Sequence, residues 1–193
     1  MPRTGLTPAE IKNRAIDIAL KNIRVHGFEK VRLTEVAREL GVSHVALYAH
    51  FESKEALLDA VLEEWLAETT AALAKVCSSS GKPLPKLERW FIAQYAMKRE
   101  RALNDRAIYS AFDTATAGNK PFVRTYLEQR FGQLVGLLKE AGVESAHRRA
   151  ALLLDGTAGF FHPRLVLESA ETNRQAELRR VLQTLLRGLG VQE

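Results

Sequence analysis

The chain has 193 residues and a net charge of +5, a length that allows one large or two small domains and a basic bias that permits nucleic-acid binding. Its only cysteine, Cys77, excludes an internal disulfide and favours a reducing compartment, so we expect a cytoplasmic protein. No apolar run approaches the roughly 20 residues that cross a bilayer, and no signal-peptide pattern is present, so we expect no membrane partner.

The first predicted helix has clear signals at both ends. Thr7-Pro8-Ala9-Glu10 combines a capping-box pattern with a proline at the first helical position. Apolar residues then recur at helical spacing, and Gly27 is suited to end the helix. We therefore expect a helix between these two signals.

A second, short helix is expected over residues 33–40, with Thr34 as its N-cap. Gly41 can adopt positive φ without a Cβ clash, which suits the position just after a helix. In that register Val42 can contact Ala37, as in a Schellman motif. The pattern predicts a tight turn at this glycine.

The third helix begins after Ser43, its expected N-cap, and ends near residue 50. Two helices joined by a three- or four-residue turn containing glycine are typical of a helix-turn-helix. A helix this short is unstable alone, because helix nucleation is costly, so its neighbours must hold it in place. We infer that it is presented to DNA. Ser53 is the expected N-cap of a long helix that follows.

The remaining residues predict only helices and no strand, so the fold class is all-α. Pro163 falls inside one of the helical patterns and is expected to kink it, and Ser145 is the expected cap of that same helix. The expected helices cover approximately 53–77, 86–103, 105–117, 120–142, 145–168 and 172–189.

Two other function classes were weighed. No glycine-rich phosphate loop, HExxH, CxxC or Gly-x-Ser-x-Gly pattern occurs, and His44 and His50 are spaced poorly for a shared metal, so we expect neither an enzyme nor a metal or other cofactor. A helical protein-interaction module without DNA binding is the alternative to a DNA-binding protein. That module predicts that Tyr48 and Lys54 are dispensable.

The N-terminal segment resembles the TetR family of bacterial transcriptional regulators. The resemblance covers about residues 8–60, and many positions agree at fixed spacing without gaps. The matching residues are Ala15, Gly27, Phe28, Val31, Leu33, Thr34, Val36, Ala37, Leu40, Gly41, Val42, Ser43, Leu47, Tyr48, His50, Phe51, Ser53, Lys54, Glu55, Ala56, Leu57 and Leu58.

The resemblance implies a three-helix DNA-binding domain over residues 1–52, followed by a helical ligand-binding and dimerisation domain over residues 53–193. It implies a regulator, by family majority a repressor, that binds a palindromic operator in double-stranded DNA as a homodimer and is released by a small-molecule effector of unknown class. The dimer would form through the last two helices; an ordinary internal core is the alternative. The candidate DNA-binding residues are Thr34, Ser43, His44, Val45, Ala46, Tyr48, His50 and Lys54.

The expected roles of these residues differ. Tyr48 and Lys54 match phosphate-contacting positions, whereas His44 and its two neighbours match positions that face base edges. This helix lacks Arg, Lys, Asn and Gln, so specificity could also depend on Arg3 in a minor-groove arm or on DNA shape. Leu47 and Phe51 are expected in the core. Tyr48 as core, and His50 as a local cap or packing residue, are the alternatives for those two positions.

The candidate ligand-binding residues are mostly aromatic and lie on helices that line the pocket in the resembled family. Asp113 and His162 would supply polar contacts. A core position is the alternative for each aromatic residue, and a solvated surface position is the alternative for Asp113. The candidates are Trp65, Phe91, Tyr95, Tyr109, Phe112, Asp113, Tyr126 and His162.

Overall fold

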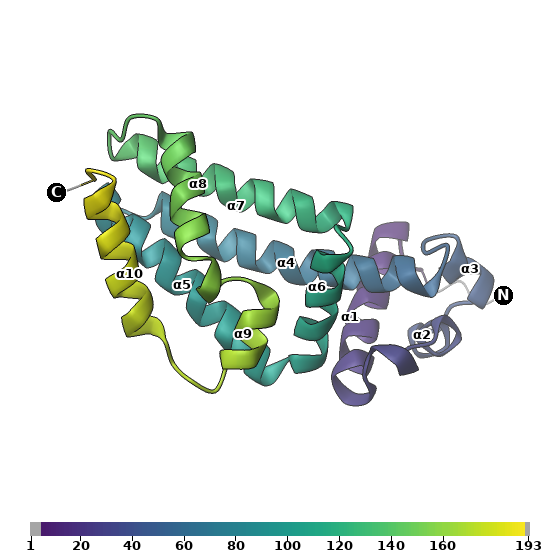
Figure 1. The fold of residues 1–193 in the computed structure, drawn as a ribbon. Helices are drawn as coiled ribbons and strands as arrows, with labels where there is room; N and C mark the ends of the chain where they lie inside the picture. The colour runs from purple at the N-terminus through teal and green to yellow at the C-terminus, as the bar shows by residue number, and fades with distance from the viewer. Residues whose placement is uncertain (1–4, 192–193) are drawn as a thin grey trace. The chain divides into compact units, whose positions relative to one another are not determined.

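The computed structural model describes residues 5–191, and every regular element in that range is a helix (Figure 1). The chain forms two compact units, which divide after Trp65. This division falls inside a long helix, α4 (Lys54–Ser78), so each unit contains part of it. An all-α fold is therefore confirmed.

The first unit contains α1 (Pro8–His26), the 3₁₀ turn η1 (Phe28–Lys30), α2 (Leu33–Leu40), α3 (His44–Tyr48) and the start of α4. Apolar side chains from all of these except η1 are buried together. The buried residues include Ala15, Ile16, Ala19, Ile23, Leu33, Val36, Ala37, Leu47, Phe51, Leu57, Val61 and Leu62.

The capping box at the start of α1 is confirmed. The Glu10 amide donates to the Thr7 hydroxyl at 3.3 Å, and the Thr7 amide donates to the Glu10 carboxylate at 2.8 Å. The bond from the Thr7 amide, together with a bond that the Thr7 hydroxyl donates to the same carboxylate at 2.8 Å, lowers the pKa of Glu10 below its ordinary value. At the other end Gly27, at φ 83°, donates its amide to the Ile23 carbonyl at 2.8 Å and ends the helix as expected.

The turn between α2 and α3 is a Schellman motif, as the sequence predicts. Gly41 is left-handed at φ 75° and ψ 23°. The Val42 amide donates to the Ala37 carbonyl at 3.0 Å, and the Gly41 amide donates to Arg38 at 3.2 Å. The Ser43 hydroxyl then accepts a hydrogen bond from the Ala46 amide at 3.1 Å, which confirms Ser43 as the N-cap of α3.

The expected N-cap of α2 is wrong. The helix begins at Leu33, and Arg32 occupies the cap position in an extended conformation. Thr34 lies inside the first turn with an exposed side chain. Leu33 is buried, and this burial draws it into the helix one residue ahead of the cap that local propensity favours.

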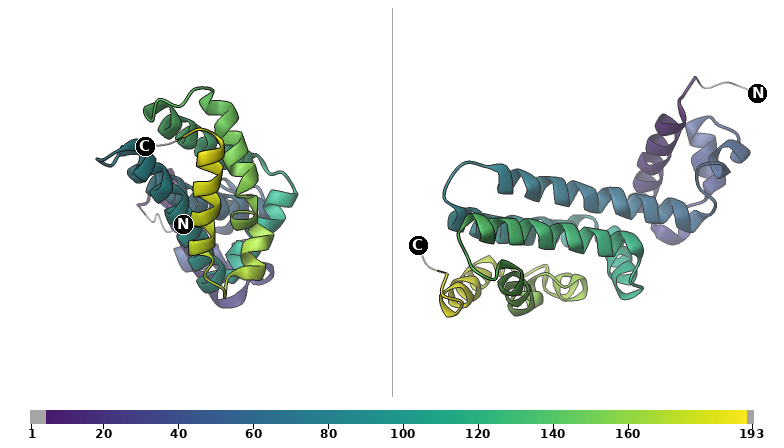
Figure 2. Two further views of the ribbon diagram at one scale, coloured as in Figure 1. Left: turned by 60° about the vertical axis from the view of Figure 1, so that its left-hand side comes forward. Right: turned by 90° about the horizontal axis from the view of Figure 1, so that it is seen from above.

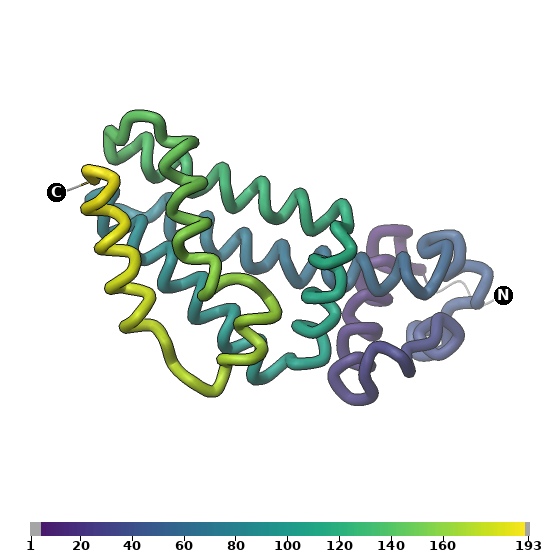
Figure 3. Tube along the Cα trace, viewed as in Figure 1, coloured from purple at the N-terminus to yellow at the C-terminus, as the bar shows by residue number. Residues whose placement is uncertain are grey.

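The second unit is organised around α5 (Pro83–Asn104), which packs closely against four helices that follow it in the chain (Figures 2 and 3). Its partners are α6 (Arg106–Ala117), α7 (Pro121–Glu140), α9 (Pro163–Ser169) and α10 (Gln175–Gly188). The remaining elements are α8 (Ala146–Gly156), which contacts α7 and α10, and the 3₁₀ turn η2 (Ala158–Phe160).

The single kinked helix expected over residues 145–168 does not form. The chain leaves α8 at Gly156, makes the η2 turn and starts α9 with Pro163 at its first position. A proline there loses no intrahelical hydrogen bond, whereas inside a helix it would also clash with the preceding turn. Ser145 precedes α8 at φ 53° and makes no side-chain capping bond. The prediction was right for most residues of α8 and α9 but wrong for residues 157–162, where it joined two helices into one.

Candidate DNA-binding and effector sites

The third helix, α3, has one buried face and one exposed face. Leu47 is 0% exposed and Phe51 is 3% exposed, so both are core residues as expected. Val45 is 77% exposed and Tyr48 is 42% exposed, which places Tyr48 outside the core. His44 is exposed beside them, and its ring meets the Tyr48 ring edge-on at 4.5 Å. The helix therefore presents a histidine, a valine and a tyrosine to the surroundings of this unit.

The other candidate DNA contacts occupy the margins of this face. Ala46 and His50 are half-buried. The Ser43 side chain is exposed but already accepts the capping bond, while Thr34 is exposed on the first turn of α2. Arg3 lies outside the described residues.

Lys54 is the first residue of α4, just after the N-cap Ser53, whose hydroxyl accepts from the Ala56 amide at 3.1 Å. Its ammonium group donates to the Glu29 carbonyl in η1 at 2.8 Å. An ammonium has three donors, so this bond leaves capacity for a phosphate oxygen. The free amides at the start of α4 favour an anion at the same place. The bond to Glu29 fixes the position of the Lys54 ammonium group, which the sequence alone does not determine.

Three of the eight candidate ligand-binding residues come together in the second unit. Tyr109 and Phe112 on α6 meet edge-to-face at 5.8 Å, and Phe112 meets Tyr126 on α7 at 6.0 Å. All three are buried. Burial raises the pKa of the Tyr109 phenol far above its ordinary value. The cluster is a closely packed aromatic wall between two helices.

Of the other five candidates, Asp113 follows Phe112 on α6, and four lie elsewhere. Phe91 packs against Phe161 at 5.8 Å, and Trp65 is buried and belongs to the first compact unit. Asp113 is half-buried and His162 is exposed at the start of α9. The structure therefore does not gather all eight residues into one place.

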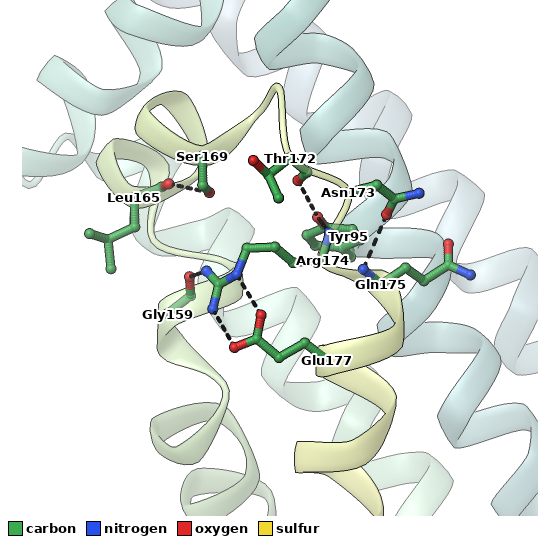
Figure 4. A network of polar contacts seen from close by, with 9 residues as sticks. All are labelled: Tyr95, Gly159, Leu165, Ser169, Thr172, Asn173, Arg174, Gln175 and Glu177. Atoms are coloured by element: carbon green, nitrogen blue, oxygen red, sulfur yellow. Dashed lines mark hydrogen bonds and ion pairs between the residues drawn. The ribbon is translucent and has the colours of Figure 1, made fainter.

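Tyr95 belongs to a polar network that joins α5 to the start of α10 (Figure 4). Its hydroxyl accepts from the Arg174 amide at 2.7 Å and donates to the Thr172 carbonyl at 3.5 Å. The Arg174 guanidinium donates to the Glu177 carboxylate at 2.8 Å and 3.0 Å and to the Gly159 carbonyl at 3.3 Å. This hydrogen bonding lowers the pKa of Glu177. Tyr95 thus already has partners on both sides.

Three polar residues that the sequence analysis missed are buried next to the aromatic wall. Lys98 on α5 is 4% exposed, and its ammonium lies 4.9 Å from the Phe112 ring centre and 5.9 Å from that of Tyr109. The Arg130 guanidinium on α7 lies 5.2 Å from the Tyr126 ring centre. Gln94 is fully buried one turn before Lys98. We call Gln94, Lys98 and Arg130 the buried polar cluster.

The charged form of Lys98 is disfavoured in this cluster. Burial lowers the pKa of Lys98 well below its ordinary value, and the positive charges of Arg130 and Arg101 lower it further. Arg101 is balanced, because it donates to the Glu68 carboxylate at 2.9 Å and to the Thr69 hydroxyl at 2.6 Å. Spacing gives a signal for two of the three missed residues: Trp90, Gln94 and Lys98 follow one another at four-residue intervals along one face of α5.

A surface groove of about 700 Å³ lies at the other end of the second unit. None of the candidate residues lines it. Its walls come from the first turns of α5, the last turns of α10 and the residue just beyond, and they include Leu84, Glu88, Arg89, Gln183, Leu186 and Val191.

Within residues 5–191, two further kinds of site are absent. No group of three or more His, Cys, Asp or Glu side chains is arranged to hold a metal ion. None of the helices in this range combines the length and apolar character needed to cross a membrane.

A capped helix-turn-helix followed by a separate helical unit defines a class of DNA-binding regulators. Residues 15–61 match the family model described as bacterial regulatory proteins of the tetR family. Residues 83–182, more than half of the chain, match the model described as the tetracyclin repressor-like C-terminal domain. The chain belongs to the TetR family of transcriptional regulators.

Individual relatives agree with this assignment. The transcriptional regulator BetI of Rhizobium meliloti is 28% identical over 162 residues, which are 81% of this chain and 79% of BetI. Two other curated relatives are matched over less than half of their own length, at 46% and 42%.

Solved structures share the fold. A TetR-like regulator from Rhodococcus sp. RHA1 superposes with a TM-score of 0.62 at 18% identity, covering 97% of this chain and 100% of that one. Thermus thermophilus FadR, solved with lauroyl-CoA, gives a TM-score of 0.60 at 20% identity, covering 92% of each chain.

Proposed function

We propose that this protein is a cytoplasmic transcriptional repressor that binds a palindromic operator as a homodimer and leaves it when a small molecule occupies the helical unit. We propose that the boundary between the DNA-binding domain and the ligand-binding and dimerisation domain lies between residues 52 and 53, just before α4. The observation that carries the proposal is the exposed face of α3. The capping bond of Ser43 stabilises the start of this helix, and Leu47 on its opposite face is buried in the core.

The chemistry of this face fits the major groove. His44 can exchange a hydrogen bond with a base edge, and Val45 and Ala46 can contact a thymine methyl group. The hydroxyl of Tyr48 and the ammonium of Lys54 suit the flanking phosphates, while Thr34, Ser43 and His50 complete the proposed contact surface. Two such helices related by a two-fold axis would read half-sites about 34–36 Å apart.

The effector part of the proposal draws on relatives and on the second unit. FadR of Thermus thermophilus was solved with lauroyl-CoA and SmeT with triclosan, so relatives of this fold hold small molecules. The proposed ligand-binding candidates here remain the eight residues named from the sequence, with Tyr109, Phe112 and Tyr126 favoured because they cluster.

The test is a mobility-shift assay with DNA that flanks the protein's own gene, repeated at several salt concentrations. Lys54→Ala should weaken binding and reduce the slope of log affinity against log salt by about 1, because one phosphate contact is lost. Tyr48→Phe should weaken binding up to about tenfold through one lost hydrogen bond.

Controls separate contact from folding. Lys54→Arg keeps the charge and should retain most of the affinity, and Lys75→Ala removes an exposed lysine from the other end of α4 and should change nothing. If Lys54→Ala and Tyr48→Phe both leave an observed shift unchanged, these phosphate contacts are wrong. If no DNA is bound, a helical protein-interaction module becomes the better function.

A further inference from the structure

The buried polar cluster lacks partners that its chemistry requires. Both amide atoms of Gln94 and the Nε of Arg130 are buried without a hydrogen bond in the described structure. Among residues 5–191, neither Lys98 nor Arg130 forms an ion pair. A buried polar group without a partner is costly, and a buried unpaired charge is costlier.

Another lysine on the same helix shows how this chain balances a buried charge. Lys86 on α5 is 5% exposed, close to the 4% of Lys98, but it forms an ion pair with Glu140 at the end of α7. Lys86 also lies near the Cys77 carbonyl, at 3.5 Å. Within residues 5–191, a carboxylate therefore pairs with one buried lysine of α5 and none pairs with the other.

The buried polar cluster is bordered by flat apolar surfaces. Lys98 faces Phe112 and Tyr109, and Arg130 lies 5.2 Å from the Tyr126 ring centre and 5.9 Å from that of Trp90. These groups come from three helices, α5, α6 and α7, of one compact unit. Binding sites for small organic molecules combine mostly aromatic walls with a few polar groups in this way.

We propose that Lys98, Gln94 and Arg130 bind the oxyanion of an aromatic organic anion whose ring system packs against Tyr109, Phe112, Tyr126 and Trp90. The ammonium and the amide NH₂ donate to the anion, and the guanidinium adds a second positive charge. The inference builds on the proposed effector function and names the chemical class of the effector. A carboxylate and a phosphate ester share this chemistry, so the experiment includes one of each.

The experiment uses the full chain and three probes measured by isothermal titration calorimetry. The probes are 3-phenylpropionate, phenyl phosphate and the neutral 3-phenylpropionamide. At least one anion should bind about tenfold or more tightly than the amide, because charge-assisted hydrogen bonds are the stronger ones. The ratio between the two anions identifies a carboxylate or a phosphate ester as the favoured group.

Lys98→Met and Lys86→Met form a matched pair of variants. Lys98→Met should remove the preference for the anion and should raise the melting temperature of the ligand-free protein, because it deletes an unbalanced buried charge. Lys86→Met should keep the preference and lower the melting temperature, because it leaves Glu140 without its partner. Stability therefore distinguishes a ligand-binding charge from a structural one, even though both are buried.

Three outcomes overturn the inference. One is an amide that binds as well as both anions, another is an anion preference that survives in Lys98→Met, and the third is a fall in melting temperature for Lys98→Met equal to that for Lys86→Met. DNA binding is measured separately: ligand-free Lys98→Met should still shift operator DNA but should no longer be released by the anion. Failure of the wild-type protein to bind DNA would contradict the proposed function and leave the anion measurements standing.

Discussion

At the scale of single residues, the start of the proposed DNA-binding helix depends on one local hydrogen bond. The α3 helix has five residues, fewer than an isolated helix needs, and its start depends on one hydroxyl. Ser43→Ala removes the bond to the Ala46 amide and should lower the free energy of unfolding by about 1 kcal/mol. Urea unfolding followed by far-UV circular dichroism measures this.

Ser145→Ala is the control for that substitution. Ser145 occupies the cap position of α8 but makes no capping bond, so the change should alter stability far less than Ser43→Ala does. If both variants lose the same free energy of unfolding, the capping bond of the Ser43 hydroxyl does not stabilise the protein.

Local signals explain which residues could be predicted from the sequence. The Thr7 and Glu10 capping box, the Gly41 turn and the Ser43 cap each involve groups three to five residues apart, so the sequence pattern contains the whole interaction. The bond from Lys54 to the Glu29 carbonyl joins residues 25 positions apart. Likewise Lys98 meets Phe112 only after α5 and α6 have packed. No spacing rule within one helix reveals such contacts.

At the scale of elements, α8 and α10 approach each other closely at a glycine. A Cβ added at Gly156 would lie 2.7 Å from one methyl of Leu185 and 3.0 Å from the other. Gly156→Ala should therefore force the half-buried side chain of Leu185 to move, and the gain in helix propensity should leave a net loss of stability of no more than about 1 kcal/mol. Thermal unfolding at one fixed protein concentration tests this.

The same substitution should have the opposite effect on α7. Gly136 lies in the interior of that helix, and a Cβ there would meet nothing within 4 Å. Gly136→Ala should stabilise the protein by about 0.5–1 kcal/mol, because alanine favours the helix more than glycine does. A loss of stability in Gly136→Ala would mean that this face of α7 is covered in solution.

Element boundaries were predicted less well than element types, for a physical reason. Hydrophobic periodicity continues through residues 145–168 because α8 and α9 each bury apolar residues, including Leu153 and Val166. Periodicity therefore cannot separate two consecutive helices that both bury an apolar face. The proline that marks the break suits both a kink and a helix start, and tertiary packing decides between them.

At the scale of the whole molecule, the proposed repressor needs two copies of the chain. Exposed apolar residues on α8 and half-buried ones on α10 would form the interface, and Leu152, which is 45% exposed on α8, offers a direct test. Leu152→Arg should dissociate the dimer in sedimentation velocity at micromolar concentration. It should also weaken operator binding strongly, because a single α3 makes too few contacts.

Leu127→Arg is the matched control, because Leu127 is 44% exposed but lies on α7. This variant should remain dimeric and should bind DNA normally. A stable monomer of the unmodified chain under the same conditions would refute the proposed interface altogether.

The cost of the buried polar cluster has a consequence for the amount of regulator in a cell. A ligand that binds only the folded chain raises its stability in proportion to the logarithm of ligand concentration. Because Lys98 is buried without a counter-charge among the described residues, the ligand-free protein is less stable than one in which this charge is balanced. The rate of proteolysis in a cell rises with the fraction of protein that is unfolded. An effector that neutralises this charge would therefore lengthen the lifetime of the regulator as it releases the DNA. The half-life of the protein, measured with and without effector after synthesis is blocked, would itself report effector binding.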